Sequence, residues 1–126
     1  MANQHLSNHV LPFDYYTPKI ELFLNYRKSI VRRYDEAFRN VEYITPYQIY
    51  GRKNSSHHIY VVSVNFERIG LTRHQFMTRL AEKGVGSQVH YIPIVSQPYY
   101  QDMGYSFEQH PKTEAYYQNA LSIPLY

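Results

Sequence analysis

The sequence contains no cysteine, and this absence excludes several kinds of chemistry. A chain without thiols forms no disulfide, has no thiolate nucleophile and offers no cysteine ligand to zinc. Such a chain suits a reducing compartment, and we predict a cytoplasmic protein. Its first ten residues, MANQHLSNHV, lack the apolar core of a signal peptide, so secretion is not expected.

Long apolar runs and glycine-rich loops are also missing. No apolar stretch approaches the ~20 residues that cross a membrane, so the sequence predicts no membrane partner. Gly84 and Gly86 follow an expected helix instead of opening one. They therefore lack the context of a dinucleotide-binding loop, which lies between a strand and the start of a helix.

The residues that are present indicate one folded domain. The chain has 126 residues, of which 44% are hydrophobic and 18% charged, too apolar for a disordered chain. The net charge of +3 would permit an RNA-binding interpretation. The aromatic residues form no consecutive stacking platform, however, so we expect no nucleic-acid partner. Fifteen tyrosines indicate that much of the surface contacts something other than water.

The first predicted element is a long helix from Pro18 to Arg39. Thr17 supplies an N-cap hydroxyl, and Pro18 suits the first helical position. Apolar side chains recur at helical spacing and predict one buried stripe. The positions with this spacing are Ile20, Phe23, Leu24, Arg27, Ile30, Val31, Tyr34, Ala37 and Phe38. Residues 1–16 show no such period and are expected to form an N-terminal tail.

Two extended segments are expected after this helix. Val41 to Tyr50 contains Pro46 and is expected to be a connector or an edge strand. After a turn at residues 51–56, His58 to Phe66 is rich in β-branched and aromatic residues. This second segment is predicted to be the central strand.

A capped helix and further short elements complete the prediction. Thr72 and Gln75 fit a capping box for a helix that ends at Lys83, with a left-handed cap at Gly84. A short strand over residues 87–91, a packed loop, a helix over 112–120 and a strand over 121–123 follow. The fold class is therefore α+β, a two-layer domain with a small, mostly antiparallel sheet covered by helices.

The segment around this short strand is the candidate binding site. Side chains alternate along a strand, so Gln88 and His90 are expected on one face, with Val89 and Tyr91 on the other. The following loop contains two prolines and is too apolar for a free loop, so we expect it to pack on something. A polar strand end beside a packed, stiff loop is typical of binding sites.

Other chemistry is less well supported by the residues. The seven histidines include His57, His58, His90 and His110, but their spacing matches no known ligand pattern. Adjacent histidines on a strand also point to opposite faces, so no metal site is predicted. Residue types for a Ser/His/Asp triad exist, but no nucleophile elbow is present.

Several segments together resemble one enzyme family. They are RKSIVRRYDEAF, SSHHIYVVSV, TRHQFMTRLAEKGVGSQVHYIPIVSQPYY and HPKTEAYYQNALSIPLY. These segments resemble the DegT/StrS family of pyridoxal-phosphate-dependent sugar-nucleotide aminotransferases. Within that family they are most similar to transaminases of the pseudaminic acid pathway and to spore coat polysaccharide proteins. The resemblance covers residues 18–126, and residues 1–16 do not share it.

The resemblance is confined to the smaller, C-terminal domain of such enzymes, as in fold-type I aminotransferases. It therefore implies a domain comprising residues 17–126, without the large domain that holds pyridoxal phosphate on a lysine. Lys53 and Lys83 lie in an expected turn and at a helix end, and neither is assigned that role. We expect a fragment that binds no pyridoxal phosphate by itself and is not catalytic alone, and no catalytic residue is assigned.

The resemblance also implies roles for the candidate segment and for partners. Gln88, Val89, His90 and Tyr91 match the family's substrate-contacting segment, where Gln88 and His90 would bind a UDP-sugar. The alternative is that His90 and Tyr91 are only packed strand residues. Expected partners are a second copy in a homodimer and a separately encoded large domain. The alternative function is a self-associating interaction module without a ligand.

Overall fold

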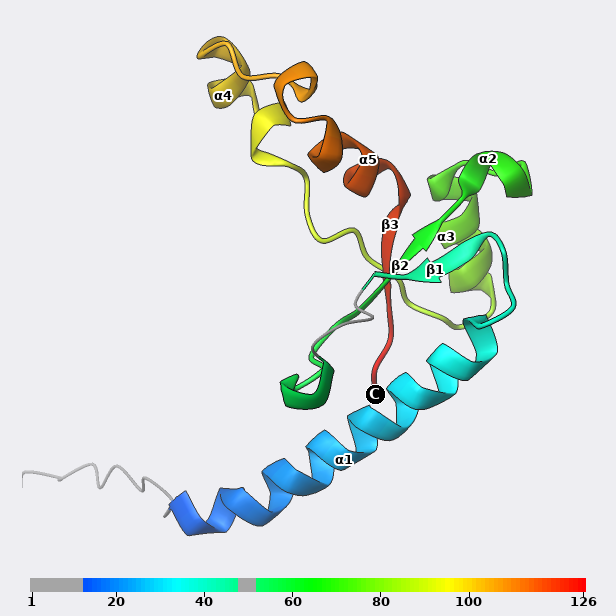
Figure 1. Ribbon diagram of the computed structural model, residues 1–126, viewed down its shortest axis with the longest axis vertical. Coiled ribbons are helices and arrows are strands. Elements are labelled where there is room, and N and C mark those ends of the chain that lie inside the picture. The colour runs from blue at the N-terminus through cyan, green and yellow to red at the C-terminus, as the bar shows by residue number, and fades with distance from the viewer. Residues whose placement is uncertain (1–12, 48–51) are drawn as a thin grey trace, which may run out of the picture.

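A computed structural model describes residues 13–47 and 52–126. Three antiparallel strands form its sheet, in the order β1 (Ile44–Pro46), β2 (Tyr60–Val64) and β3 (Ala120–Ile123) (Figure 1). Strand β2 is central, as predicted. Strand β1 is an edge strand, where the missing N–H of Pro46 costs no interior ladder bond.

Helices and single helical turns make up the other elements. The α-helices are α1 (Phe13–Phe38), α2 (Phe66–Ile69), α3 (Arg73–Glu82), α4 (Pro98–Asp102) and α5 (Pro111–Asn119). The 3-10 turns are η1 (Arg52–Asn54), η2 (Ile94–Ser96) and η3 (Phe107–Gln109). Together with the antiparallel sheet they confirm the α+β fold class. None of the helices among the described residues is long and apolar enough to cross a membrane.

Helix α1 begins before the predicted start. Its first residue is Phe13, so Thr17 is not the N-cap and Pro18 lies inside the helix. Proline has a helical φ but lacks an N–H and crowds the carbonyl of the preceding turn, so Pro18 weakens the start of α1 without ending the helix. The rest of the expected tail, residues 1–12, lies outside the described residues.

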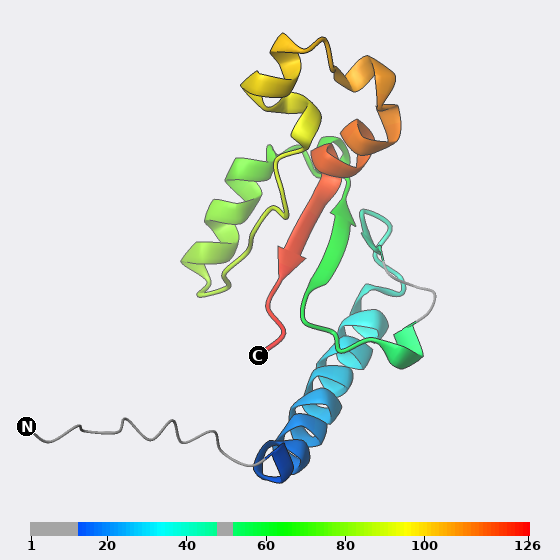
Figure 2. The same ribbon diagram turned by 90° about the vertical axis from the view of Figure 1, so that its left-hand side faces the viewer.

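The core lies where α1 and α3 meet the sheet. Its buried members are Val31, Tyr60, Val62, Val64, Leu121 and Leu125. Phe76, Met77 and Leu80 of α3 pack against it, as their helical spacing predicts. In α1 only the second half of the apolar stripe does so, through residues such as Ile30 and Tyr34. In the first half Phe23 remains 58% exposed, because this part of α1 projects beyond the sheet (Figure 2).

The capping box of α3 is confirmed. The Thr72 hydroxyl accepts the Gln75 N–H at 3.2 Å, and the Gln75 side chain accepts the Thr72 N–H at 2.9 Å. At the other end, Lys83 is the C-cap and Gly84 has a φ of +75°. These two ends fix where the chain leaves α3 and enters the candidate segment.

The predicted strand over residues 87–91 is wrong. Only Gln88 pairs with the sheet, through an isolated bridge to Ser122. The Gln88 N–H donates to the Ser122 carbonyl at 3.1 Å, and the Ser122 N–H donates to the Gln88 carbonyl at 2.8 Å. Because β3 is short and the chain then diverges toward η2, no ladder continues past this bridge (Figure 1).

The following loop, which was expected to pack on something, does not pack on the sheet of this chain. Tyr91, Ile92, Ile94 and Tyr99 are all more than half exposed. The segment forms η2 and α4, which contact one another and extend away from the sheet (Figure 1). Its aromatic rings meet locally, as Tyr100 does with Tyr99 and Tyr105, instead of entering the core.

Candidate functional site

The bridge at Gln88 places the candidate segment beside the last strand. Two residues after the bridge, the Nδ1 atom of His90 lies 2.7 Å from the hydroxyl oxygen of Ser122. The rings of His90 and Tyr91 meet edge to face, with centroids 4.7 Å apart. The segment is therefore attached to β3 through both its backbone and a side chain, although it is not a strand.

A groove of about 380 Å³ lies along this attachment. Its polar lining residues are Arg27, His58, Ser87, Gln88, His90, Ser122 and Tyr126. They come from α1, the approach to β2, the candidate segment, β3 and the last residue. Of the four predicted site residues, Gln88 and His90 line this groove. Val89 and Tyr91 are not among its lining residues, and the Tyr91 side chain is 78% exposed.

The floor of the groove is connected to α1 by one hydrogen bond. The Tyr34 hydroxyl donates to the Pro124 carbonyl at 2.8 Å. Burial raises the pKa of Tyr34, and the Arg33 charge opposes this shift. The hydroxyl therefore stays protonated and available as a donor. Periodicity identified Tyr34 only as an apolar stripe residue, because its partner lies near the other end of the chain.

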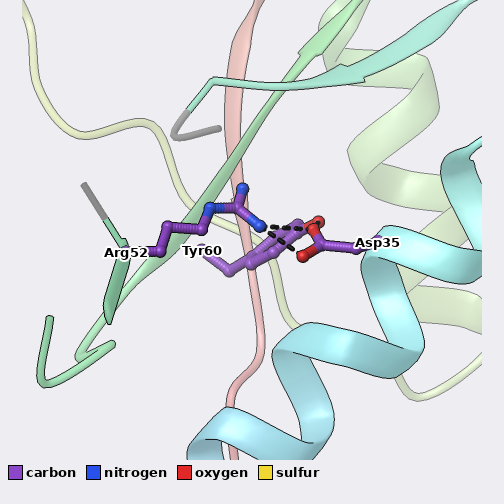
Figure 3. Close-up of polar contacts among 3 residues, drawn as sticks. All are labelled: Asp35, Arg52 and Tyr60. Atoms are coloured by element: carbon purple, nitrogen blue, oxygen red, sulfur yellow. Dashed lines mark hydrogen bonds and ion pairs between the residues drawn. The ribbon is translucent and has the colours of Figure 1, made fainter. Parts of the chain in front are cut away.

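A second polar cluster joins α1, η1 and β2 (Figure 3). One guanidinium nitrogen of Arg52 donates to both carboxylate oxygens of Asp35 at 2.5 Å. The Tyr60 hydroxyl donates to the same carboxylate at 2.7 Å, and the Arg52 guanidinium lies 5.4 Å from the centre of the Tyr60 ring. Burial is the main cause that raises the pKa of Tyr60, followed by the hydrogen bond to Asp35.

Asp35 and Arg52 also line a separate groove of about 810 Å³ beside β1. Sequence analysis did not identify this cluster. The available signal was a tyrosine in a strand of aliphatic residues, and an aspartate next to the buried stripe of α1. Because all three polar groups satisfy one another, the cluster is a structural link between α1 and the sheet.

The two adjacent histidines have different environments. His57 is buried with a φ of +48°, whereas His58 is exposed at the groove. The pKa of His57 is lowered, first by burial and then by the charges of Arg52 and Lys28. In the part of the chain that the structure describes, no three histidine or acidic side chains cluster as metal ligands.

Acidification should destabilise the fold through His57. In the unfolded chain this imidazole takes up a proton as the pH falls through about 6.5, whereas the folded state binds it only at lower pH. The unfolded state therefore binds more protons in this window, and the free energy of unfolding falls. We expect His57→Asn, which suits the left-handed backbone, to lose less stability than the parent chain between about pH 7.5 and pH 5.5.

Urea unfolding at both pH values measures this difference. The exposed His110 provides a matched control, since His110→Asn should keep the pH dependence of the parent chain. Equal losses in the parent and His57→Asn would contradict the assignment.

Comparison with known proteins shows the family to which this chain belongs. The model of the DegT/DnrJ/EryC1/StrS aminotransferase family matches residues 17–126. The chain belongs to this family. Its SQVHY segment and its terminal strand therefore lie within the family's matched region.

Three known proteins are similar to this chain in sequence or in structure. The spore coat polysaccharide biosynthesis protein SpsC of Bacillus subtilis is 36% identical over 103 residues, covering 79% of this chain and 26% of SpsC. The apo-form of Spr1654 from Streptococcus pneumoniae, assigned as a sugar aminotransferase, superposes with a TM-score of 0.71 at 30% identity. The match covers 86% of this chain and 27% of Spr1654. Helicobacter pylori PseC, an aminotransferase of pseudaminic acid biosynthesis, has a TM-score of 0.66 at 26% identity. The match covers 80% of this chain and 27% of PseC.

This chain thus spans about a quarter of the length of these relatives. Pyridoxal phosphate chemistry in such enzymes requires a lysine that forms a Schiff base. Among the described residues, no lysine lines either groove. The exposed Lys83 is the cap of α3, away from both linings. The described linings of these two grooves therefore include no residue that could form this Schiff base.

Proposed function

We propose that this chain is the small, substrate-contacting part of a sugar-nucleotide aminotransferase and is not catalytic alone. The observation that carries the proposal is the groove that Gln88, His90 and Arg27 line together. Family membership and similarity to two sugar aminotransferases support it.

The groove has the chemistry that a sugar nucleotide needs. Arg27 is a permanent cation with several N–H donors, which suits phosphate oxygens. His58 and His90 add ring nitrogens, and the Gln88 amide can both donate and accept. Phosphates and sugar hydroxyls are recognised by such donors. The proposal therefore assigns substrate contact to Gln88 and His90, with Val89 and Tyr91 as their neighbours in the segment.

The exposed apolar surface of α1 supports a protein partner. Ile20, Leu22, Phe23 and Tyr26 are each about half exposed or more. Isolated exposed apolar residues are ordinary, but several on one helix mark an interaction surface. We propose that this surface is covered in a homodimer or by a separately encoded domain that carries pyridoxal phosphate, in the cytoplasm.

Titration with UDP-N-acetylglucosamine tests the proposed substrate contact. We expect weak binding to the chain alone, with a dissociation constant of about 1 mM, because only part of a substrate site is present. Amide chemical shifts in NMR spectra should move at residues 86–90 and 122–126. His90→Ala should weaken binding, whereas the control His110→Ala should not. Shifts elsewhere, or none at about ten times that concentration, would contradict the assignment.

Two further measurements complete this test. The chain mixed with pyridoxal phosphate should show no internal-aldimine absorbance band, and a band that borohydride removes by modifying one particular lysine would contradict the non-catalytic role. Sedimentation equilibrium should show self-association, or a complex formed only with a cofactor-bearing domain. A chain of 15.1 kDa that stays monomeric alone and with such a domain would refute the partner proposal.

A further inference from the structure

The hydroxyl of Ser122 is held in place from both sides. Ser122 is opposite Val61 in the ladder between β2 and β3, and it bridges to Gln88 on its other edge. Ser122 as a whole is only 6% exposed. These contacts fix the backbone of Ser122, and its hydroxyl oxygen lies 2.7 Å from Nδ1 of His90.

The burial of Ser122 determines which group donates in this contact. A hydroxyl has one proton to donate, and a neutral imidazole has one N–H and one bare nitrogen. Among the described residues, His90 is the only partner of the Ser122 hydroxyl. If Nδ1–H donated to it, the hydroxyl proton would have no protein acceptor among the described residues, and in a residue only 6% exposed a lost hydrogen bond costs about 1–3 kcal/mol. Donation from Ser122 to Nδ1 avoids this cost.

Donation to Nδ1 determines the tautomer of His90. The neutral ring must then have its proton on Nε2. Because Nδ1 is occupied by Ser122, Nε2 is the polar atom of this groove-lining ring that remains for a ligand. His90 therefore presents a donor to the groove, as Arg27 does.

We propose that Ser122 is a positioning residue that fixes His90 as an Nε2–H donor for a phosphate or sugar oxygen of the bound ligand. The ligand part of this inference rests on the proposed function. The tautomer part does not, since it follows from the contact between β3 and the candidate segment. A ligand with a hydrogen-bond donor in place of that oxygen would be rejected, because two donors would face each other.

Long-range ¹H–¹⁵N NMR correlations of the ligand-free chain test the tautomer directly. The spectra are recorded in alkaline buffer, where imidazoles are neutral, and His90→Gln identifies the His90 signals. We expect the parent chain to show the Nε2–H tautomer of His90. Ser122→Ala should give a mixture of both tautomers, and Ser122→Thr, which keeps the hydroxyl, should restore the single form. Ser63→Ala removes a hydroxyl from the neighbouring strand and should change nothing.

The outcomes separate this inference from the proposed function. An Nδ1–H tautomer in the parent chain, or the same tautomer in Ser122→Ala, overturns the positioning role even if UDP-N-acetylglucosamine binds. Loss of the tautomer preference in Ser122→Ala, together with binding weakened about two- to tenfold, supports both parts. The same loss in a chain that does not bind the nucleotide sugar supports the tautomer and refutes the ligand role.

Discussion

Replacing Leu121 with alanine is expected to lower the free energy of unfolding by about 2–5 kcal/mol. Leu121 is 0% exposed and lies opposite the buried Val62, in the pair of strands that joins the end of the chain to the centre of the sheet. Truncation removes apolar contacts and leaves a cavity, and the neighbouring strands restrict how far the site can collapse. The two residues on either side, Ala120 and Ser122, are buried as well.

Leu22→Ala is the matched control for this change. Leu22 belongs to α1 but is 67% exposed in the single chain, so in the monomer, at a concentration too low for self-association, the same truncation should change stability by no more than about 0.5 kcal/mol. Urea unfolding followed by circular dichroism measures both variants. Similar losses would mean that Leu22 is covered in solution, as the proposed partner surface on α1 requires, whereas a small loss at Leu121 would contradict the core.

The sequence was sufficient to predict elements that depend on local chemistry. The capping box of Thr72 and Gln75 needs only residues three positions apart, and the β-branched run around Val62 needs only its neighbours. The strand over residues 87–91 was wrong because pairing depends on a distant partner. Ser122 offers the segment only one bridge. The apolar residues after it suggested packing, but periodicity does not show whether a surface exists to receive them.

In the candidate site too, residues recognised from the local sequence were predicted, whereas residues placed by distant contacts were not. Gln88 and His90 were predicted from their polar character and from the family resemblance, and both line the groove. Arg27 was assigned to the helix stripe, and Ser122 to a strand. Their position at the groove depends on contacts between segments far apart in the chain. The cluster of Asp35, Arg52 and Tyr60 was missed for the same reason.

Removing the carboxylate of Asp35 should be the largest polar effect in the chain. Asp35→Ala leaves the Arg52 guanidinium, whose side chain is 18% exposed, and the buried Tyr60 hydroxyl without their shared acceptor. We expect a loss of about 1–3 kcal/mol in the free energy of unfolding. This is less than the roughly 3–5 kcal/mol for a fully buried pair, because 37% of the Asp35 side chain meets solvent.

Glu36→Ala and a double-mutant cycle separate this cluster from general charge effects. Glu36 is the exposed neighbour on α1, so its removal changes the net charge equally and should cost little. Because Tyr60 donates to Asp35, Tyr60→Phe and Asp35→Ala should couple by about 0.5–3 kcal/mol. Asp35 also contributes, after burial, to the raised pKa of Tyr60, so Asp35→Ala should lower that pKa in an NMR titration of the ring. Additive stability losses with an unchanged Tyr60 pKa would show that Asp35 does not link α1 to the sheet.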